Sequence, residues 1–335
     1  MKFLDLFQRK SNQEVDSYWE YDSTKHFRPK LNTSEFYSTM NYDLFYYVFE
    51  IISEYIENEE NELKYSHTLS YGQKAIYFLK YVENDVLNGG FTQYYVNGYG
   101  KCTPTIIKAL DYIGDSKMSE IINRSYSVYL KQINKFNVAN KLINSGIVSN
   151  IHNETTGFDH LDTEFEDNYD DTILNIARYI RRNPNEFFVD ENGSEFDLKY
   201  TGEYIIKYPN GKNKDILQLQ NGIITGEYSN YYENGNIKFM THYKEGMLTG
   251  DSFEYYENGN IKFKFHRNVE ENRDEYFDYF ENGNLNKMAY KLIGKDVLNG
   301  EYKEWYKNGN LKLDLEFKNN EKIKHNRWNE DGVRI

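Results

Sequence analysis

The sequence predicts an α+β protein in which a helical N-terminal domain is followed by a repetitive antiparallel array of β-hairpins forming a single sheet. Apolar residues recur at helical spacing between residues 41 and 182, and Asn-Gly pairs recur at near-constant intervals after residue 200. The chain holds 33 Tyr and 21 Phe but only four Pro, a composition that favours strands. Because 335 residues are many for one hydrophobic core, two domains are expected.

We expect three segments along the chain. Residues 1–40 form an N-terminal extension, residues 41–190 an acidic helical domain, and residues 200–335 about six hairpin repeats. The net charge is −13: residues 1–190 carry 19 basic and 28 acidic side chains, and residues 191–335 carry 21 and 25. An acidic surface of this kind attracts basic partners and repels nucleic acid and anionic lipid.

Helices are expected in the N-terminal domain near residues 41–58, 70–85, 103–114, 116–134 and 170–182, where apolar residues follow a helical period. Pro104 marks a helix start, since proline is tolerated at the first helical position, and Gly114 marks the end of that helix. The last helix begins with Asp170 and ends with Arg182, a polarity that suits the helix dipole.

The segment "NDVLNGGFTQYYVNGYG", residues 84–100, separates the second and third expected helices. Asn-Gly cannot form a hairpin here because helices flank it, but the glycines let the chain turn sharply at a helix end. The segment is either a binding loop or a corner between helices. Its candidate residues are Asn88, Gly89, Gly90, Phe91 and Gln93.

This segment resembles the motif Leu-Asn-Gly-Gly-Phe-x-Gln-Tyr/Phe-Tyr/Phe-x-Asn of a domain family named after a bacterial DNA-mimic protein. The match runs from Leu87 to Asn97, and the resemblance extends over residues 40–188. It implies an acidic, mostly helical domain that binds proteins. The founding member of the family imitates the charge of DNA and thereby occupies a DNA-binding protein.

The C-terminal half repeats one unit, in which an aromatic arm precedes Asn-Gly and an alternating arm follows it. The turn glycines are separated by 24, 24, 24, 26 and 23 residues: Gly211, Gly235, Gly259, Gly283, Gly309 and Gly332. Asn-Gly between strands predicts a type I′ turn, which needs positive φ at both central residues. Stacked hairpins would bury one another's aromatic faces, and the exposed aromatic residues Tyr232, Tyr256 and Tyr306 are candidate partner contacts.

These units resemble the MORN-variant repeat, and the closest named group is the YwqK-like antitoxin family. The resemblance covers about residues 200–334. The fourth unit departs from it, having Asp274 in place of the leading glycine and Asn286 in place of the lysine after the turn. The last unit lacks the aromatic pair, which is typical of the cap of a repeat array.

Residues 142–177 contain no Lys or Arg but many acids, which are candidate partner-binding residues: Glu154, Asp159, Asp162, Glu164, Glu166, Asp167, Asp170 and Asp171. They form either a solvated acidic loop or a charged docking face. A calcium loop would need a glycine at its sixth position and a glutamate at its twelfth, and neither is present. We therefore expect neither a metal nor another cofactor.

Nothing in the sequence supports catalysis, so we expect no enzyme. Phosphate-binding loops and nucleophile elbows are absent, and the single cysteine, Cys102, is expected to be a buried thiol. A non-catalytic protein-binding module is the favoured function: a bacterial immunity or antitoxin protein that binds and occludes a basic toxin domain. The alternative is an acidic DNA mimic that sequesters a DNA-binding protein or transcription factor, and a hydrolase is the third possibility. With no signal segment or membrane span, the cytoplasm is the expected location, and neither nucleic acid nor membrane is an expected partner.

Overall fold

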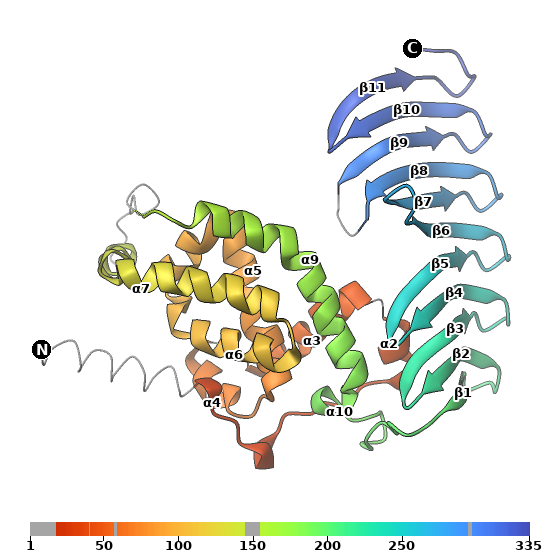
Figure 1. The fold of residues 1–335 in the computed structure, drawn as a ribbon. Helices are drawn as coiled ribbons and strands as arrows, with labels where there is room; N and C mark the ends of the chain where they lie inside the picture. Colours follow the sequence, from red (N-terminus) through yellow and green to blue (C-terminus); the bar gives the residue numbers. More distant parts are fainter. Residues whose placement is uncertain (1–17, 40, 57–58, 145–154, 294–296) are drawn as a thin grey trace, which may run out of the picture. The chain divides into compact units, whose positions relative to one another are not determined.

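The structure is a computed structural model that describes residues 18–39, 41–56, 59–144, 155–293 and 297–335. Its contacts divide the chain into two units. The first comprises the chain up to Asn32 together with Thr39–Phe196, and the second comprises Thr33–Ser38 with Asp197–Ile335. Helices make up the first unit and a hairpin sheet dominates the second (Figure 1), so the predicted α+β class is confirmed.

The helical unit is a bundle in which α5 (Tyr71–Val96) packs against α3, α6, α7 and α9. The core holds apolar residues at helical spacing, among them Leu44, Val48 and Ile52 of α3, each no more than 1% exposed. The other elements of this unit, in chain order, are η1 (Ser23–Lys25), α3 (Asn41–Ile56), α4 (Glu59–Ser66), η2 (Tyr99–Lys101), α6 (Thr103–Ile113), α7 (Ser116–Asn144), α9 (Asp159–Arg182) and α10 (Pro184–Phe187).

Two predicted helices, near 41–58 and 103–114, coincide with α3 and α6, and Gly114 ends α6 with a φ of 88°. Three others are longer than predicted. The helix from Tyr71 extends up to the non-helical Gly89 and Gly90, and a second helical segment of α5 follows them to Val96. In addition, α7 reaches Asn144, and α9 begins at Asp159 instead of near Asp170. Packing against neighbouring helices stabilises these extensions, which local sequence signals did not indicate.

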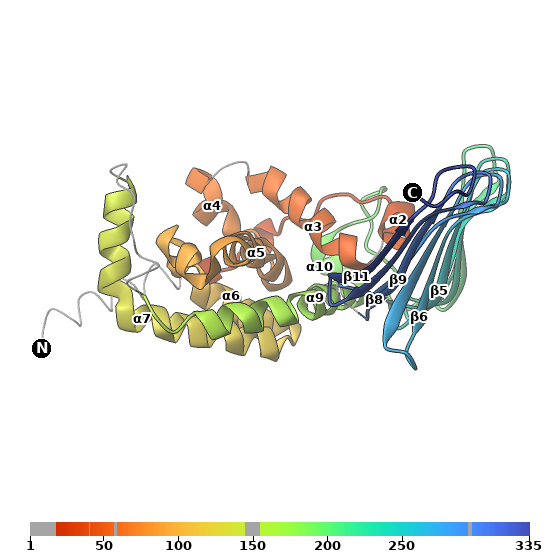
Figure 2. The same cartoon turned by 90° about the horizontal axis from the view of Figure 1, so that it is seen from above.

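The sheet has eleven strands in sequential order, and each strand pairs antiparallel with its neighbours in the chain. Seen from above, the strands curve together (Figure 2). The strands are β1 (Gly202–Lys207), β2 (Asn213–Gln220), β3 (Ile223–Tyr231), β4 (Ile237–Lys244), β5 (Met247–Tyr255), β6 (Ile261–Asn268), β7 (Arg273–Tyr279), β8 (Leu285–Leu292), β9 (Leu298–Trp305), β10 (Leu311–Lys318) and β11 (Glu321–Arg327). The single hairpin sheet predicted for the repeats is confirmed.

The type I′ prediction for the repeated Asn-Gly turns is wrong. Gly235 has a φ of 99°, but Asn234 before it is not among the residues with positive φ. The amide of Gly235 donates to the carbonyl of Tyr232 at 2.9 Å, and Tyr232 donates to the carbonyl of Asn236 at 2.9 Å. This is a three-residue loop with glycine in the left-handed position. The side chain of Asn234 accepts a bond from the amide of Asn236 at 2.8 Å, which stabilises this loop.

Turns with consecutive positive φ lie at the other ends of the strands, away from the Asn-Gly turns. Asn221 and Gly222 have φ values of 52° and 71°, and Glu245 and Gly246 have 51° and 81°. The Asn-Gly dipeptide alone does not distinguish these turns, because the length of the loop is not visible in the dipeptide. The loop length decides which turn fits the twist of the strands.

The repeated Asn-Gly-Asn also joins neighbouring repeats. The side-chain amides of Asn234 and Asn236 both donate to the backbone carbonyl of Glu257, at 3.3 and 2.9 Å. The same pair of bonds recurs at each following turn, from Asn258 and Asn260 to Glu281, from Asn282 and Asn284 to Lys307, and from Asn308 and Asn310 to Glu330. Each turn is therefore hydrogen-bonded to the next by side chains as well as by the sheet.

A short helix from the N-terminal part of the chain, α2 (Thr33–Ser38), belongs to the sheet unit. Its Ser34 hydroxyl donates to a carboxylate oxygen of Asp215 on β2, and Asp215 is fully buried. The other carboxylate oxygen of Asp215 accepts from the Tyr228 hydroxyl at 2.8 Å and from the Asn230 amide at 2.7 Å. These three donors compensate the burial of the carboxylate.

Candidate protein-binding surfaces

The acidic stretch predicted as a docking segment or a solvated loop is the first half of α9, so the loop interpretation is wrong. Leu161, Phe165 and Tyr169 recur every four residues and are no more than 5% exposed, which gives the helix a buried stripe. Asp159 and Asp162 lie in its first turn, where acidic side chains interact favourably with the helix dipole. Glu154 lies outside the described residues.

Three of the predicted acids are engaged inside the helical unit. Asp162 accepts a hydrogen bond from the backbone amide of Phe91 at 2.7 Å. Glu164 pairs with Arg124, whose guanidinium hydrogen bonds hold the pKa of this carboxyl below its usual range. Asp170 accepts from the Tyr42 hydroxyl at 3.1 Å. These contacts connect α9 to α5, α7 and α3.

The remaining four described acids, Asp159, Glu166, Asp167 and Asp171, are exposed. Measured from Asp159, the others lie seven, eight and twelve residues along α9, which puts all four on its outward side. The buried stripe of Leu161 occupies the opposite side of the helix. The exposed acids therefore form one negative row along a helix that is held in place by its buried side. We call these four residues the acidic row.

The Asn-Gly-Gly segment forms a kink inside α5. Gly90 has a φ of 71°, and a Cβ atom at this position would lie 2.4 Å from an Oδ atom of Asp162. Phe91 is fully buried against Phe158 and Phe165, and the side-chain amide of Gln93 donates to Asp85 at 3.2 Å. Of the five candidate residues, Gly89 shares the kink, and Asn88 is exposed with its amide bonded to the carbonyl of Asn84. The geometry is that of a corner within the bundle.

The predicted aromatic contacts Tyr232, Tyr256 and Tyr306 are half-buried, and each hydroxyl is engaged. They donate to backbone carbonyl groups of the following repeat: Tyr255 at 2.7 Å, Tyr279 at 2.8 Å and Trp328 at 3.1 Å. Their hydroxyls join repeats, and contact of their rings with a partner stays a prediction.

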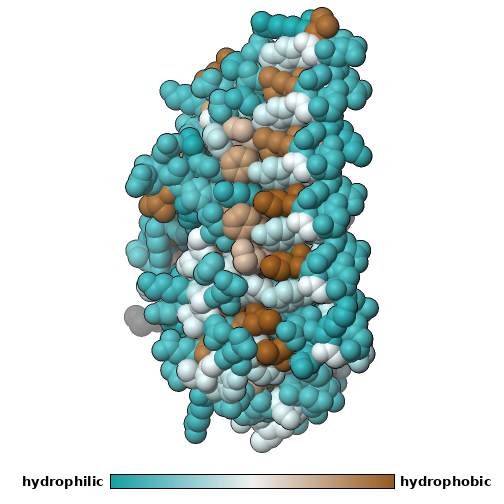
Figure 3. Space-filling model, turned by 90° about the vertical axis from the view of Figure 1, so that its right-hand side faces the viewer, coloured by the Kyte–Doolittle hydropathy of each residue, from teal (hydrophilic) through white to brown (hydrophobic). Residues whose placement is uncertain are grey.

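A column of apolar and aromatic side chains runs along the sheet beside the Asn-Gly turns (Figure 3). At each turn the first apolar residue of the second arm pairs with the aromatic residue that ends the first arm. The half-buried pairs are Tyr231 with Ile237, Tyr255 with Ile261, Tyr279 with Leu285, and Trp305 with Leu311. These residues were not among the predicted partner contacts, although the Ile or Leu that follows each Gly-Asn is visible in the sequence.

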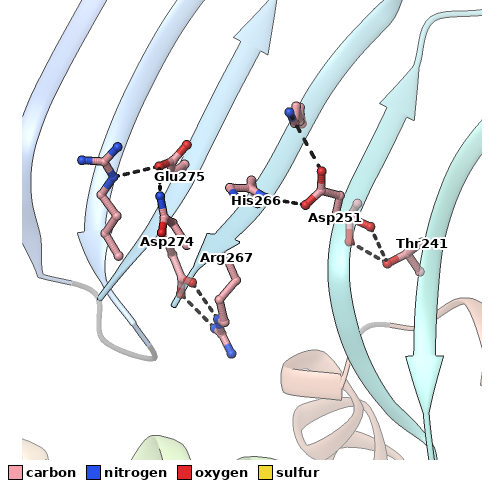
Figure 4. Close-up of polar contacts among 10 residues, drawn as sticks. Thr241, Asp251, His266, Arg267, Asp274 and Glu275 are labelled. Carbon is pink, nitrogen blue, oxygen red and sulfur yellow. Dashed lines mark hydrogen bonds and ion pairs between the residues drawn. The ribbon is translucent and has the colours of Figure 1, made fainter. Parts of the chain in front are cut away.

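Strands β5, β6 and β7 also carry polar pairs that the sequence did not indicate (Figure 4). His266 pairs with Asp251, and Arg267 contacts Asp274 with two bonds of 2.7 and 2.9 Å. Ser252 is the residue after Asp251, so strand alternation directs its hydroxyl to the other face of the sheet from Asp251 and His266. These groups therefore do not assemble into a nucleophile and base, and the pairs tie strands together.

The fully buried thiol of Cys102 is also unsuited to chemistry, because burial raises its pKa. Within the described residues, no group of three or more His, Cys, Asp or Glu side chains could hold a metal ion. None of the described helices combines the length and apolar character needed to span a membrane.

Comparison with known families finds a match in each half of the chain. Residues 67–183 match the DMP19-like protein family. Within the array, residues 224–245, 248–268 and 298–319 match the MORN repeat variant. A search of curated proteins finds no match to the chain. Both kinds of domain indicate a module that binds proteins.

The match to the DMP19-like family begins before α5 and ends after α9, so it contains the kink and the acidic row. The repeat matches leave out residues 269–297, the segment with Asp274 and Asn286. The resemblances to the DNA-mimic domain family and to the MORN-variant repeat are thus confirmed.

Proposed function

We propose that this chain is a non-catalytic immunity or antitoxin protein, which binds a basic toxin domain and covers the toxin's active site in the bacterial cytoplasm. The observation that carries the proposal is the acidic row on α9. Its four carboxylates face outward while Asp162, Glu164 and Asp170 fix the same helix to the bundle. A negative surface on a rigid support accelerates association with a positive one and disfavours other partners.

A second candidate function is a DNA mimic that occupies a DNA-binding protein or transcription factor. The match of residues 67–183 to the DMP19-like family favours it, together with the four exposed acids on the outward side of α9. The two candidates predict the same surface but different partners. A toxin encoded beside this gene, neutralised when the two are co-expressed, supports the immunity function. Retention of a DNA-binding protein that has no toxicity supports the mimic.

The test is affinity purification from the native host followed by mass spectrometry of the retained protein, with charge-reversal variants for comparison. The variant Asp159→Lys, Glu166→Lys, Asp171→Lys reverses part of the row and leaves Glu164 paired with Arg124. A matched control reverses three exposed glutamates at the repeat turns: Glu233→Lys, Glu281→Lys and Glu330→Lys.

We expect the row variant to associate more slowly with the retained partner, while the control variant associates normally. Association with the wild type should slow as salt rises, because the Debye length is about 10 Å at 0.1 M and shorter above that. If association does not depend on salt and the row variant associates normally, the acidic row is not part of the interface. The aromatic rings of Tyr232, Tyr256 and Tyr306 would then be the next side chains to truncate.

A further inference from the structure

The sheet already binds one helix on one of its faces. Over β1–β3 this face receives α2, whose Phe36 and Tyr37 are 1% and 4% exposed. The Tyr37 ring packs beside that of Tyr204, with 6.4 Å between ring centroids, and the Ser34 hydroxyl reaches Asp215. A short helix that carries two aromatic residues and an acidic Glu35 is thus accommodated on the face of a hairpin array.

The same face continues to the other end of the array. Neighbouring strands place one side chain after another in a row across the sheet: Leu217, Tyr228, Thr241, Ser252, Phe265, Tyr276, Ala289, Tyr302 and Leu315. Leu217 and Tyr228 lie beside Asp215 in the part that α2 covers. Leu315 lies at the far end of the row, so the two ends of the sheet present a common surface.

At that far end lies a pocket of about 360 Å³, lined by Glu304, Lys312, Leu313, Leu315, Lys322, His325 and Arg327. Leu313 pairs with Arg327 and Leu315 with His325, so the apolar floor and the basic rim belong to adjacent strands. The aromatic pair Tyr302 and Phe317, with ring centroids 6.1 Å apart, extends the floor.

The rim is positive in a protein whose net charge is −13. Lys322, His325 and Arg327 are exposed, and within the part of the chain that the structure describes their side chains make no hydrogen bond or ion pair. A neighbouring cation of β11, Lys324, is paired with Asp314 at 2.8 Å. Within the pocket, Lys312 is bonded to Glu304 at 2.9 Å. The pocket therefore combines the cations Lys322 and Arg327 with an apolar floor.

We propose that this face of β9–β11 docks an acidic amphipathic helix of a partner protein, seated as α2 is seated at the other end of the sheet. Its apolar side would lie on Leu313, Leu315 and Phe317, and its carboxylates would meet Lys322 and Arg327. A small anion would satisfy the rim but leave the apolar floor exposed, which is why an amphipathic helix fits better. The site is distinct from the acidic row: it binds an acidic partner, whereas the acidic row binds a basic one.

The experiment measures binding of a labelled synthetic helical peptide to the full chain by fluorescence anisotropy. The peptide carries Glu along one side and Leu and Phe along the other, and a second peptide carries Lys in place of every Glu. The test variant is Lys322→Glu with Arg327→Glu, and the control is Lys207→Glu with Lys244→Glu, two exposed lysines elsewhere on the sheet. Circular dichroism confirms that both variants keep the fold.

We expect the acidic peptide to bind about tenfold or more tightly than the basic one, and the test variant to lose about tenfold in affinity while the control keeps it. Equal binding of the two peptides, or unchanged affinity in the test variant, overturns the proposal. Complete displacement of the peptide by millimolar inorganic phosphate overturns it in favour of an anion site. Self-association of the wild type that the test variant abolishes overturns it in favour of a second copy of this chain. None of these results bears on the proposed binding of a basic toxin to the acidic row, which is tested separately.

Discussion

The hydroxyl group of Tyr232 donates a hydrogen bond to the backbone carbonyl of Tyr255, 2.7 Å away and one repeat further along the chain. The equivalent bond runs from Tyr208 to Tyr231, from Tyr256 to Tyr279 and from Tyr306 to Trp328. In these repeats the tyrosine just before the turn therefore donates to a carbonyl of the next repeat. The fourth repeat has Phe280 at this position and lacks the hydroxyl.

This relationship predicts that Tyr256→Phe lowers the free energy of unfolding by about 0.5–1.5 kcal/mol, the net value of one hydrogen bond. The measurement is urea denaturation followed by circular dichroism. The reverse change is Phe280→Tyr in the fourth repeat. Its new hydroxyl would be placed to donate to the carbonyl of Trp305, as the repeat pattern predicts. That variant should be as stable as the wild type or more so. Unchanged stability in Tyr256→Phe would mean that water replaces the bond without loss.

The repeat turns predict a second stability change. Gly259 has a φ of 89°, and a Cβ atom there would have no heavy atom within 4 Å. Gly259→Val should therefore cost about 1–3 kcal/mol through backbone strain alone. Gly259→Asn should cost less, because asparagine tolerates the left-handed region. Equal melting temperatures for the two variants would show that the loop relaxes to negative φ.

The kink of α5 predicts a different kind of loss at Gly90. Gly90→Ala adds strain at a φ of 71° and also places a Cβ atom 2.4 Å from the carboxylate of Asp162. Gly98→Ala is the matched control, since Gly98 has a φ of 89° and open space around it. Gly90→Ala should be the more destabilising by at least about 1 kcal/mol. Thermal unfolding checks this, and equal losses would show that α9 moves aside freely.

In the double variant Gly90→Ala, Asp162→Ala the clash is gone, so the two losses should not add. Additive losses would mean that Asp162 and Gly90 act independently, against the contact between the Asp162 carboxylate and the Phe91 amide.

Much of the fold could be predicted because its determinants are local. The apolar period of α3 lies within one helix, and so do the start signal Pro104 and the stop signal Gly114 of α6. The Asn-Gly repeats are likewise local, so the single sheet followed from them. The turn type did not follow, because it depends on a loop of three residues closed by Tyr232 and Asn236.

The candidate surfaces were less predictable because burial and pairing arise between distant segments. Nothing near Glu164 in the sequence shows that it pairs with Arg124, and Asp162 meets Phe91 from another helix. The sequence identifies the acids but does not show which of their side chains are exposed. The docking face of β9–β11 was missed for the same reason, because strand register brings Leu315 beside His325.

A buried lysine predicts how stability depends on pH. Lys74 of α5 has no exposed surface, its Nζ donates to the carbonyl of Glu20, and burial lowers its pKa to about 7. The unfolded chain, with an ordinary lysine pKa, binds more protons than the folded chain between pH 7 and about 10, so this group makes stability rise with pH in that window. Below pH 7 both states are protonated and the cost of the buried charge is constant.

Lys74→Met should therefore raise the free energy of unfolding at pH 7 by more than about 1 kcal/mol and flatten its rise toward pH 10. The control is Lys117→Met, since Lys117 is exposed. Chemical denaturation at several pH values gives both slopes. A parallel pH dependence in Lys74→Met and the wild type would show that Lys74 is not the group that titrates.

The position of α2 on the sheet predicts the outcome of dividing the chain. Cleavage between residues 188 and 200 should release a mainly helical and a mainly β piece, but the β piece then lacks Thr33–Ser38. Without the hydroxyl of Ser34, one oxygen of the buried Asp215 loses its donor, which costs at least about 1–3 kcal/mol. A fragment of residues 197–335 should therefore melt well below the sheet of the full chain.

A peptide spanning residues 30–41 added in trans should raise the melting temperature of this fragment in a concentration-dependent way, because the peptide binds the folded fragment and not the unfolded one. The same peptide with Ser34→Ala should raise it less, and with Phe36→Ala hardly at all, since Phe36 is the buried anchor of α2. If the fragment is as stable as the full chain and ignores all three peptides, α2 contributes nothing to the sheet, and its use as a precedent for helix docking on β9–β11 falls with it.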